Sequence, residues 1–485
     1  MTALARAMPG YRSDNHEYSC TGLNTCRYAQ EGSGHLKGCR LPVAASALRQ
    51  LTGHHAFMTA RGKRCTMEPS PSLVLRNVTV PGGRITDIEI REGKVVHAGS
   101  ATSADQSVDC TGLFVLPAAV DMHVHMRGGP QSAKEDWSSG SRSALAGGVT
   151  VVVDQPNTIP PITNPESFRA RVLEAKAHSF CSFAINSGVT FDTPVRAMWS
   201  LGAMAFGETF FAPSSYGDAI TKDELAAALR EIHSCGALAT IHAEEIGSGA
   251  DNSLPAHEQV RSAEGELRAV KAVQECNTAG CRLHFCHLSS GDSIAAVTGS
   301  VEVTPHHLFL AVDRFRPDDA LGKVNPPLRS GRERKGLWTR WQRIDVIASD
   351  HAPHTLPEKR LPFSEAPSGI PGVETMVPLL MAEVVEKRIS LKDVIAKTST
   401  TPAILLGIPP AGFAPGDRAD FALYPKTAVP VDPDLLHSRC GFSPFAGLPA
   451  VFPSRVILGG TIVYDEGEFT CGQPLWFAGK GYYPQ

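Results

Sequence analysis

No long run of apolar residues occurs in the 485-residue chain. A membrane-spanning helix needs roughly 18 consecutive apolar residues, and no stretch reaches that length. The start of the chain also lacks the charged segment followed by an apolar segment that marks a secretory signal. We therefore expect a cytoplasmic protein with no membrane partner, whose twelve cysteines are reduced.

The chain also lacks an excess of charge of either sign. It carries 46 Lys and Arg against 49 Asp and Glu, which gives a formal net charge of -3. Without a surplus of basic residues, the sequence predicts neither nucleic-acid binding nor attachment to an acidic membrane surface. A small-molecule substrate is therefore the expected partner. The hydrophobic content of 42% is enough for one large core and a smaller accessory domain.

Residues 1–66 differ from the rest of the chain because they show little sustained apolar periodicity. Gly, Ser, Arg and His are scattered through this segment, and we predict a disordered N-terminal extension. Two alternatives stay open: a working protein that begins near Met58 or Met67, and a small zinc module. The gap between the first two cysteines of that module is wider than in a common zinc pair. Its four ligands would be Cys20, Cys26, His35 and Cys39.

Segments that alternate apolar and polar residues occur at both ends of the remaining chain. The first begins at Ser72 in SLVLRNVTVPGGRITDIEIREGKVVHAGS, where Gly and Asn separate short strand-like runs. The same pattern returns in ADFALYP and SRVILGGTIVYDEGEF. We predict that residues 67–116 and 411–485 form one small β-sandwich domain, with the middle of the chain inserted between its two halves.

Strand and helix patterns alternate through the middle of the chain, residues 117–410. Two helix starts are well marked, by Asn164 before a proline and by a capping-box pattern of Thr221 and Glu224. Eight strands alternating with helices predict an α/β fold of the (β/α)8 TIM barrel type. The candidate strands are AAVDMHVH, VTVVVDQP, SFAINSGV, AMAFGETFF, LATIHAE, RLHFCHLS, VEVTPHH and DVIASDH.

Histidines and a carboxylate stand at the ends of four of these strands. His123 and His125 end the first strand in DMHVHMRGG, and because side chains alternate along a strand they face the same side. His242, His287 and Asp350 end the fifth, sixth and eighth strands. Barrel enzymes place their chemistry at these strand ends, and imidazole nitrogens with a carboxylate oxygen suit Zn2+. The sequence therefore predicts a metal centre, although a histidine pair alone is often structural.

The chain resembles the amidohydrolase superfamily, and within it the dihydroorotases of the H-x-H-x-R type. The likeness covers about residues 72–470 and rests on DMHVHMR, DQPNT, IHAEE, CHLSS, TPHHLFL, NPPLR, SDHAPHT, SGIPGVET and HSRCGFSPFAG. It implies two Zn2+ per subunit, with Asp350 as a metal ligand and as the catalytic acid and base. The histidine ligands that it implies are His123 and His125 for one ion, and His242 and His287 for the other.

Arg127 follows the histidine pair and offers a planar guanidinium, which suits a two-point contact with a substrate carboxylate. An ion pair with a neighbouring acid is the simpler alternative. The resemblance implies that three further residues join Arg127 around the carboxylate and the ring amides of the substrate. They are Asn157, Asn325 and His354.

One position departs from much of the superfamily. Many relatives bridge two metal ions with a carboxylated lysine on the fourth strand, whereas this chain has Glu208 in FGETFF. The resemblance extends to dihydroorotases that have an acidic residue near this place, so we include Glu208 among the expected metal ligands. It would bridge two ions, bind one ion, or leave the pair of ions looser. An ordinary hydrogen-bonded carboxylate is the remaining alternative.

The resemblance implies reversible, metal-dependent cyclisation of N-carbamoyl-L-aspartate to L-dihydroorotate in pyrimidine (UMP) synthesis. Two alternatives stay open. An allantoinase-like or hydantoinase-like enzyme would not require the carboxylate contact of Arg127. A catalytically silent barrel would serve as a scaffold for aspartate carbamoyltransferase, and loss of metal ligands would mark it. Self-association and binding to aspartate carbamoyltransferase are the protein interactions that we expect.

Overall fold

The computed structural model describes residues 57–58, 64–65, 71–80, 83–101, 103–210 and 219–484. The first two segments are short strands, β1 (Phe57–Met58) and β2 (Arg64–Cys65), which pair antiparallel. Most of the predicted N-terminal extension, including every residue of the zinc-module alternative, lies outside the described residues. The elements described below belong to one compact unit, His55–Gln485.

Eight parallel strands form the barrel that the sequence predicted, and all eight candidate strands are confirmed. Three pair in the order β10-β9-β8 and five in the order β11-β12-β13-β14-β15. Parallel bridges from Ser187 to Phe206 and from Val124 to His351 join the two sheets and close the ring. The strands are β8 (Ala119–Val124), β9 (Val149–Asp154), β10 (Ser182–Ile185), β11 (Phe206–Phe210), β12 (Leu238–His242), β13 (Arg282–Phe285), β14 (Ser300–Val303) and β15 (Val346–Ile347).

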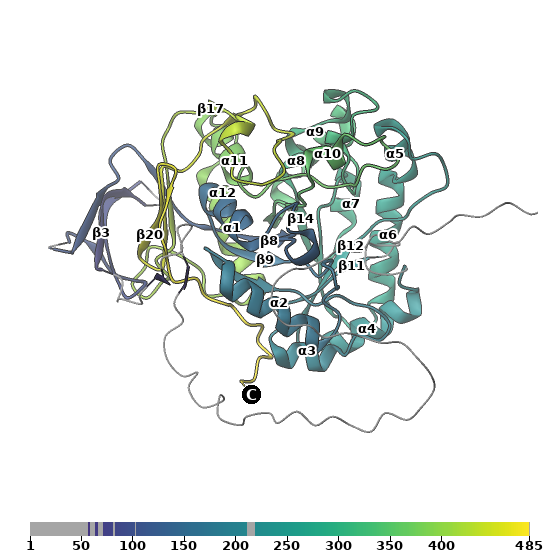
Figure 1. Cartoon of the computed structure of the whole chain (residues 1–485), viewed down its shortest axis with the longest axis horizontal. Helices are drawn as coiled ribbons and strands as arrows, with labels where there is room; N and C mark the ends of the chain where they lie inside the picture. The colour runs from purple at the N-terminus through teal and green to yellow at the C-terminus, as the bar shows by residue number, and fades with distance from the viewer. Residues whose placement is uncertain are drawn as a thin grey trace, which may run out of the picture. The chain divides into compact units, whose positions relative to one another are not determined.

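Helices follow the strands and surround them (Figure 1). Both marked helix starts are confirmed: Asn164 Oδ1 accepts two backbone N–H groups ahead of α2, and Thr221 forms a capping box with Glu224 ahead of α4. These caps satisfy N–H groups that have no partner inside a helix. The helices are α1 (Trp137–Ala146), α2 (Pro165–His178), α3 (Val195–Leu201), α4 (Lys222–Ser234), α5 (Leu254–Val260), α6 (Ala263–Cys276), α7 (Gly291–Ala296), α8 (Pro305–Phe309), α9 (Gly331–Thr339), α10 (Leu356–Lys359), α11 (Met376–Val385), α12 (Leu391–Ile395), a π-helical stretch (Ala396–Thr400) and α13 (Thr401–Leu406).

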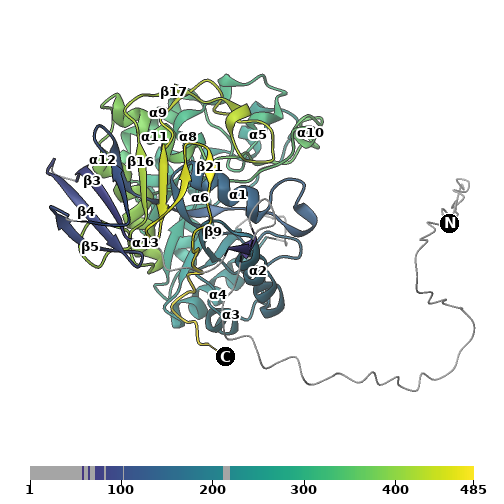
Figure 2. The same ribbon diagram turned by 60° about the vertical axis from the view of Figure 1, so that its left-hand side comes forward.

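Two further sheets form the small β domain, and both ends of the described chain contribute to it, as predicted. One sheet has the order β5-β4-β3-β6, and the other has the order β21-β20-β19-β16-β7. Figure 2 shows the two sheets side by side, and their facing sides bury Leu75, Ile90 and Phe421 in one apolar cluster. The strands are β3 (Leu73–Thr79), β4 (Ile85–Arg91), β5 (Lys94–Gly99), β6 (Gln106–Asp109), β7 (Phe114–Pro117), β16 (Phe421–Tyr424), β19 (Arg455–Leu458), β20 (Thr461–Asp465) and β21 (Glu468–Phe469), and a separate pair is β17 (Val429–Pro430) with β18 (Pro449–Ala450).

Apolar side chains from several barrel strands pack into one cluster that includes Val120, Val151, Ala184 and Val346. This packing fixes the strands relative to one another, and therefore also the places where their carboxyl ends stand. The polar residues predicted for the site lie at those ends. Among the residues that the structure describes, no helix is both long enough and apolar enough to cross a membrane.

The expectation that all twelve cysteines are reduced is wrong. Cys471 is disulfide-bonded, whereas Cys110, Cys181 and Cys286 are buried free thiols. Burial raises the pKa of the Cys286 thiol to about 12, so this group stays protonated.

Candidate metal centre

Every predicted metal ligand stands at or just beyond the carboxyl end of a barrel strand. Three lie within strands: His123 in β8, Glu208 in β11 and His242 at the end of β12. All of the predicted ligands are buried. The barrel therefore gathers ligands from five different strands at one end. The ligands that follow β8, β13 and β15 are His125, His287 and Asp350.

Three of the predicted site residues have left-handed backbone conformations. The φ angles are 50° at Arg127, 35° at His287 and 45° at Asp350. A residue other than glycine in this region costs roughly 1–3 kcal/mol, and such strain is concentrated at functional sites. These turns at the strand ends therefore favour a functional role for the three residues.

His123, His125 and Asp350 form the first ligand group. Nε2 of His125 lies 3.1 Å from Oδ1 of Asp350, and Nε2 of His123 lies 3.6 Å from the same oxygen. The Nε2 atom of His123 is buried and has no hydrogen-bond partner among the described residues. A buried polar atom without a partner is costly, so a cation between these atoms fits the geometry.

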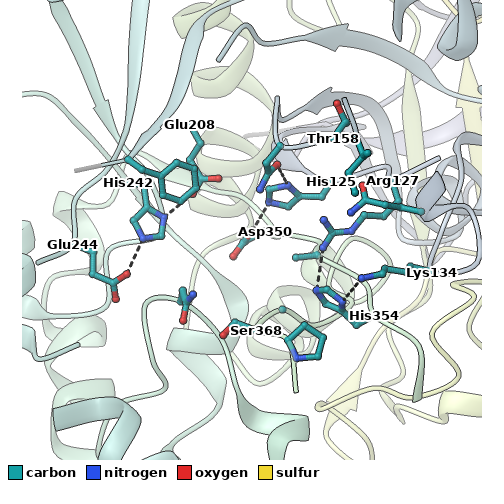
Figure 3. Close-up of a pocket in the computed structure, with 18 of the residues that line it drawn as sticks. His125, Arg127, Lys134, Thr158, Glu208, His242, Glu244, Asp350, His354 and Ser368 are labelled. Atoms are coloured by element: carbon teal, nitrogen blue, oxygen red, sulfur yellow. Dashed lines mark hydrogen bonds and ion pairs between the residues drawn. The ribbon is translucent and has the colours of Figure 1, made fainter. Parts of the chain in front are cut away.

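The second ligand group is Glu208 with the two histidines that contact it, His242 and His287; the ligand atoms of Glu208 and His287 also lie within 4.8 Å of that of His123. Oε1 of Glu208 lies 2.7 Å from Nδ1 of His242 and 2.8 Å from Nε2 of His287. The other oxygen, Oε2, lies 3.6 Å from Nε2 of His123 in the first group. Glu208 therefore presents one oxygen to each group. Figure 3 shows Glu208 and His242 on one side of the cavity, with Asp350 and His125 beside them.

Negative charge around the histidines favours a bound cation. Burial lowers the pKa of His123, but Glu302 and Glu208 raise it well above its ordinary value. In the same way Glu208 and Glu244 overcome burial and raise the pKa of His242 to about 9. A field that holds protons on buried imidazoles also attracts a divalent cation, which displaces those protons when it binds.

Glu302 on β14 orients ligands of both groups. Its Oε1 accepts from Nδ1 of His123 at 3.1 Å and from the backbone N–H of His287 at 2.9 Å. Its Oε2 lies 3.0 Å from Nε2 of His284. With the Nδ1 proton of His123 directed at Glu302, the Nε2 lone pair is left for a metal. Sequence reasoning missed Glu302, although a charged residue inside the buried strand VEV was a signal for it.

We expect Glu302→Gln to lower the affinity for Zn2+ by roughly 10–100-fold, because the amide cannot accept every hydrogen bond that the carboxylate accepts. Competition against a chelator of known affinity measures the effect. Glu264→Gln, at an exposed position of α6, is the matched control. Equal affinities in the two variants would show that His123 keeps its orientation without Glu302.

The ligand groups open into a cavity of about 400 Å3, whose wall includes all four predicted substrate-binding residues. Arg127 is buried: its Nε donates to the carbonyl oxygen of Pro353 at 3.2 Å, and its Nη2 lies 3.3 Å from Nε2 of His354. Burial lowers the pKa of Arg127 to about 10, and no carboxylate forms an ion pair with it among the described residues. A buried guanidinium without such a partner suits an anionic ligand.

The two asparagines take different positions in the cavity wall. Oδ1 of Asn157 lies 2.6 Å from Nδ1 of His125, which fixes the proton there and turns Nε2 of the ring toward Asp350. Asn157 thus contacts a metal ligand, which the sequence did not predict. Oδ1 of Asn325 is buried and has no partner among the described residues. It is therefore an acceptor available to a ligand.

Sequence reasoning also missed three charged residues of the cavity wall, Lys134, Glu244 and Arg261. Each lies in a loop or at a helix end that follows a barrel strand. Loops at this end of a barrel build its active site, and charged residues in them were therefore the signal that could have identified these three. Glu244 accepts from both His242 and Arg261, so it connects the second ligand group to the wall.

Comparison with known proteins gives relatives over most of the chain. The model of the amidohydrolase family matches residues 114–463. The dihydroorotase of Methanosarcina acetivorans is 38% identical over 434 residues, which are 82% of this chain and 93% of that protein. The dihydroorotase of Halobacterium salinarum is 37% identical over 406 residues, with 81% and 96% covered.

Solved structures share the same fold. The L-hydantoinase from Arthrobacter aurescens superposes with a TM-score of 0.77 at 27% identity, and the match covers 83% of this chain and 98% of that one. The dihydropyrimidinase from Brevibacillus agri gives a TM-score of 0.75 at 22% identity, which supports the fold alone. The family match, the identity to curated relatives and the buried ligand groups agree, and the chain belongs to the amidohydrolase family and, within it, to the dihydroorotases.

Proposed function

We propose that the chain interconverts L-dihydroorotate and N-carbamoyl-L-aspartate as a step of de novo pyrimidine synthesis. The observation that carries this proposal is the buried Arg127 guanidinium, which faces the cavity beside the metal ligands and has no carboxylate partner among the described residues. Dihydroorotate brings a carboxylate to that place, whereas a plain hydantoin or an allantoin ring brings none. The site therefore favours the dihydroorotase reaction over both alternatives.

The side chains fit two Zn2+ per subunit. His123, His125 and Asp350 would hold one ion. His242 and His287, which both contact Oε1 of Glu208, would hold the other. Glu208 offers one carboxylate oxygen to each side, so it would contribute to holding an ion on either side. When bound, the ions polarise the ring carbonyl and lower the pKa of the attacking water.

Asp350 is the residue that we propose to move the proton. Although burial raises the pKa of a carboxyl, the contact with His125 and the charges of His123 and His287 keep the pKa of Asp350 below its usual value. It is therefore ionised and ready to accept. In ring opening it takes a proton from the attacking water and delivers it to the ring nitrogen as the C–N bond breaks. In ring closure the same carboxyl group acts in the reverse order.

The cavity wall would bind and orient the ring. Arg127 and His354 donate to the substrate carboxylate, which keeps the ring amide near Asp350. The unpartnered Oδ1 of Asn325 suits a ring N–H donor, and Asn157 lines the same cavity while it holds His125. Holding the reacting groups close together and correctly oriented accounts for a large part of the rate enhancement that such a site can give.

We expect Arg127→Met to raise the KM for L-dihydroorotate by roughly 10–100-fold and to change kcat much less, because the lost contact is made to a part of the substrate that does not react. Steady-state kinetics measure both constants. Arg332→Met, at an exposed position of α9, serves as the control. An unchanged KM would assign Arg127 a purely structural role.

The function itself is tested by offering the purified zinc-loaded protein L-dihydroorotate, hydantoin and allantoin in parallel. Ring opening of L-dihydroorotate alone supports the proposal. Turnover of another cyclic amide alone would transfer the assignment to that substrate, and no turnover by folded, metal-loaded protein would favour the silent scaffold. Cytoplasmic location, self-association and binding to aspartate carbamoyltransferase stay predictions.

A further inference from the structure

Three basic side chains meet at the wall of the cavity on the side away from Glu208 and His242 (Figure 3). The imidazole of His354 lies between two cations. Nη2 of Arg127 is 3.3 Å from its Nε2, and Nζ of Lys134 is 3.2 Å from its Nδ1. Lys134 also lies 2.9 Å from Oε1 of Glu358, which fixes the position of the ammonium group.

The two contacts of the His354 ring cannot both be hydrogen bonds while the ring is neutral. A neutral imidazole has one donor nitrogen and one acceptor nitrogen, whereas ammonium and guanidinium groups only donate. If Nδ1 accepts from Lys134, the ring proton lies on Nε2 and points toward the N–H groups of Arg127. Two donors then face the same point, and an anion placed there would satisfy both.

The surroundings of His354 keep the ring neutral. Burial lowers the pKa of His354, and the positive charges of Arg127, Lys134 and Lys359 lower it further. The backbone carbonyl of Ser368 acts in the other direction, and Oε2 of Glu358 lies 3.9 Å from Nδ1. Because the ring carries no charge, it can donate a hydrogen bond to an anion in the cavity only from the nitrogen that holds the proton.

We propose that Lys134 is a positioning residue that holds the proton of His354 on Nε2, so that His354 and Arg127 donate to one substrate carboxylate. With the proton on Nδ1 instead, the Nε2 lone pair would take an N–H group of Arg127 and repel the carboxylate. Without Lys134, Nε2 of the neutral His354 ring could accept an N–H group of Arg127 that the substrate needs. With Lys134 in place, Nε2 carries the proton and donates to the substrate carboxylate. This inference rests on the proposed function, because it requires a substrate that carries a carboxylate.

The test compares binding of orotate, a ring acid that keeps the carboxylate, to the wild-type holoenzyme and to Lys134→Met at two pH values. At about pH 8 we expect the variant to bind orotate roughly tenfold more weakly and to show a similar rise in KM for L-dihydroorotate, with kcat changed less than about twofold. Burial and Arg127 still lower the pKa of His354 in the variant, so the ring stays neutral and the factor is expected to be the same at about pH 6 and pH 8. When His354 is first replaced by leucine, Lys134→Met is expected to change the Kd much less, because Lys134 acts through the His354 ring.

Two further variants separate positioning from a general effect of charge. Lys134→Arg keeps a donor at Nδ1 and is expected to bind orotate nearly as tightly as the wild type at both pH values. Lys271→Met, at an exposed position of α6, removes a distant positive charge and should leave the Kd unchanged. Circular dichroism establishes that each variant is folded, and Lys134→Leu replaces the methionine variant if that one is not.

An unchanged Kd in Lys134→Met would overturn the inference. A Kd that rises by the same factor in the His354→Leu background would also overturn it, because loss of a charge that does not act through His354 gives that result. The proposed function is judged separately, since ring opening of L-dihydroorotate by the wild-type protein is measured before any variant is compared.

Discussion

Replacing Asp350 with asparagine is expected to lower kcat for L-dihydroorotate by about 10²–10⁴-fold while the protein keeps its fold. Asparagine has the size and the carbonyl oxygen of the native side chain, so the packing around it changes little. It cannot take a proton from the attacking water or deliver one to the ring nitrogen. The loss should be similar for ring opening and ring closure, because the same group acts in both directions.

The Asp350 variant is interpretable only when its metal content is known. Oδ1 of Asp350 lies 3.1 Å from Nε2 of His125, so the substitution also touches the first ligand group. Zinc per chain is therefore measured beside kcat, and Asp292→Asn at an exposed site of α7 controls for the loss of one negative charge. Lost turnover with zinc retained supports proton transfer by Asp350, and turnover near the wild-type rate would contradict it.

The barrel was predictable because each strand has a local signature. VTVVVD and LATIH are short apolar runs bounded by helices with recognisable caps, and they are fully buried as β9 and β12. The ligands on these strands were predictable for a related reason. A polar residue at the carboxyl end of a barrel strand has few structural uses, so His242 and Asp350 stood out from their apolar neighbours.

The supporting contacts could not be predicted, because they join residues that are far apart in the chain. His123 meets Glu302 across 179 positions, and Lys134 meets His354 across 220. No local pattern tells which charged residue of one loop faces which histidine of another. The register shifts between β8 and β9 and the left-handed backbone at Arg127 also depend on the closed barrel, and a regular strand extrapolated from the sequence lacks both.

Removing the metal ions with a chelator is expected to abolish turnover of L-dihydroorotate, and adding Zn2+ is expected to restore it. No described side chain replaces the polarisation of the ring carbonyl that the ions supply, and the unpartnered Nε2 of His123 indicates a site built around a cation. Melting temperature with and without zinc shows whether the fold survives. Full activity in metal-free protein would refute the metal assignment.

The number of zinc ions that each chain binds tests the role of Glu208. Its two oxygens lie against different ligand groups, at 2.7 Å from His242 and 3.6 Å from His123. If it bridges two ions, Glu208→Gln should bind one zinc per chain tightly and the second roughly 10–100-fold more weakly than the wild type, because an amide carries no negative charge to share between two cations. Titration of apo protein with zinc separates the cases. Two equally tight ions in the variant would make Glu208 a hydrogen-bonding group, and a single ion in the wild type would show that this carboxylate serves one site instead of bridging two.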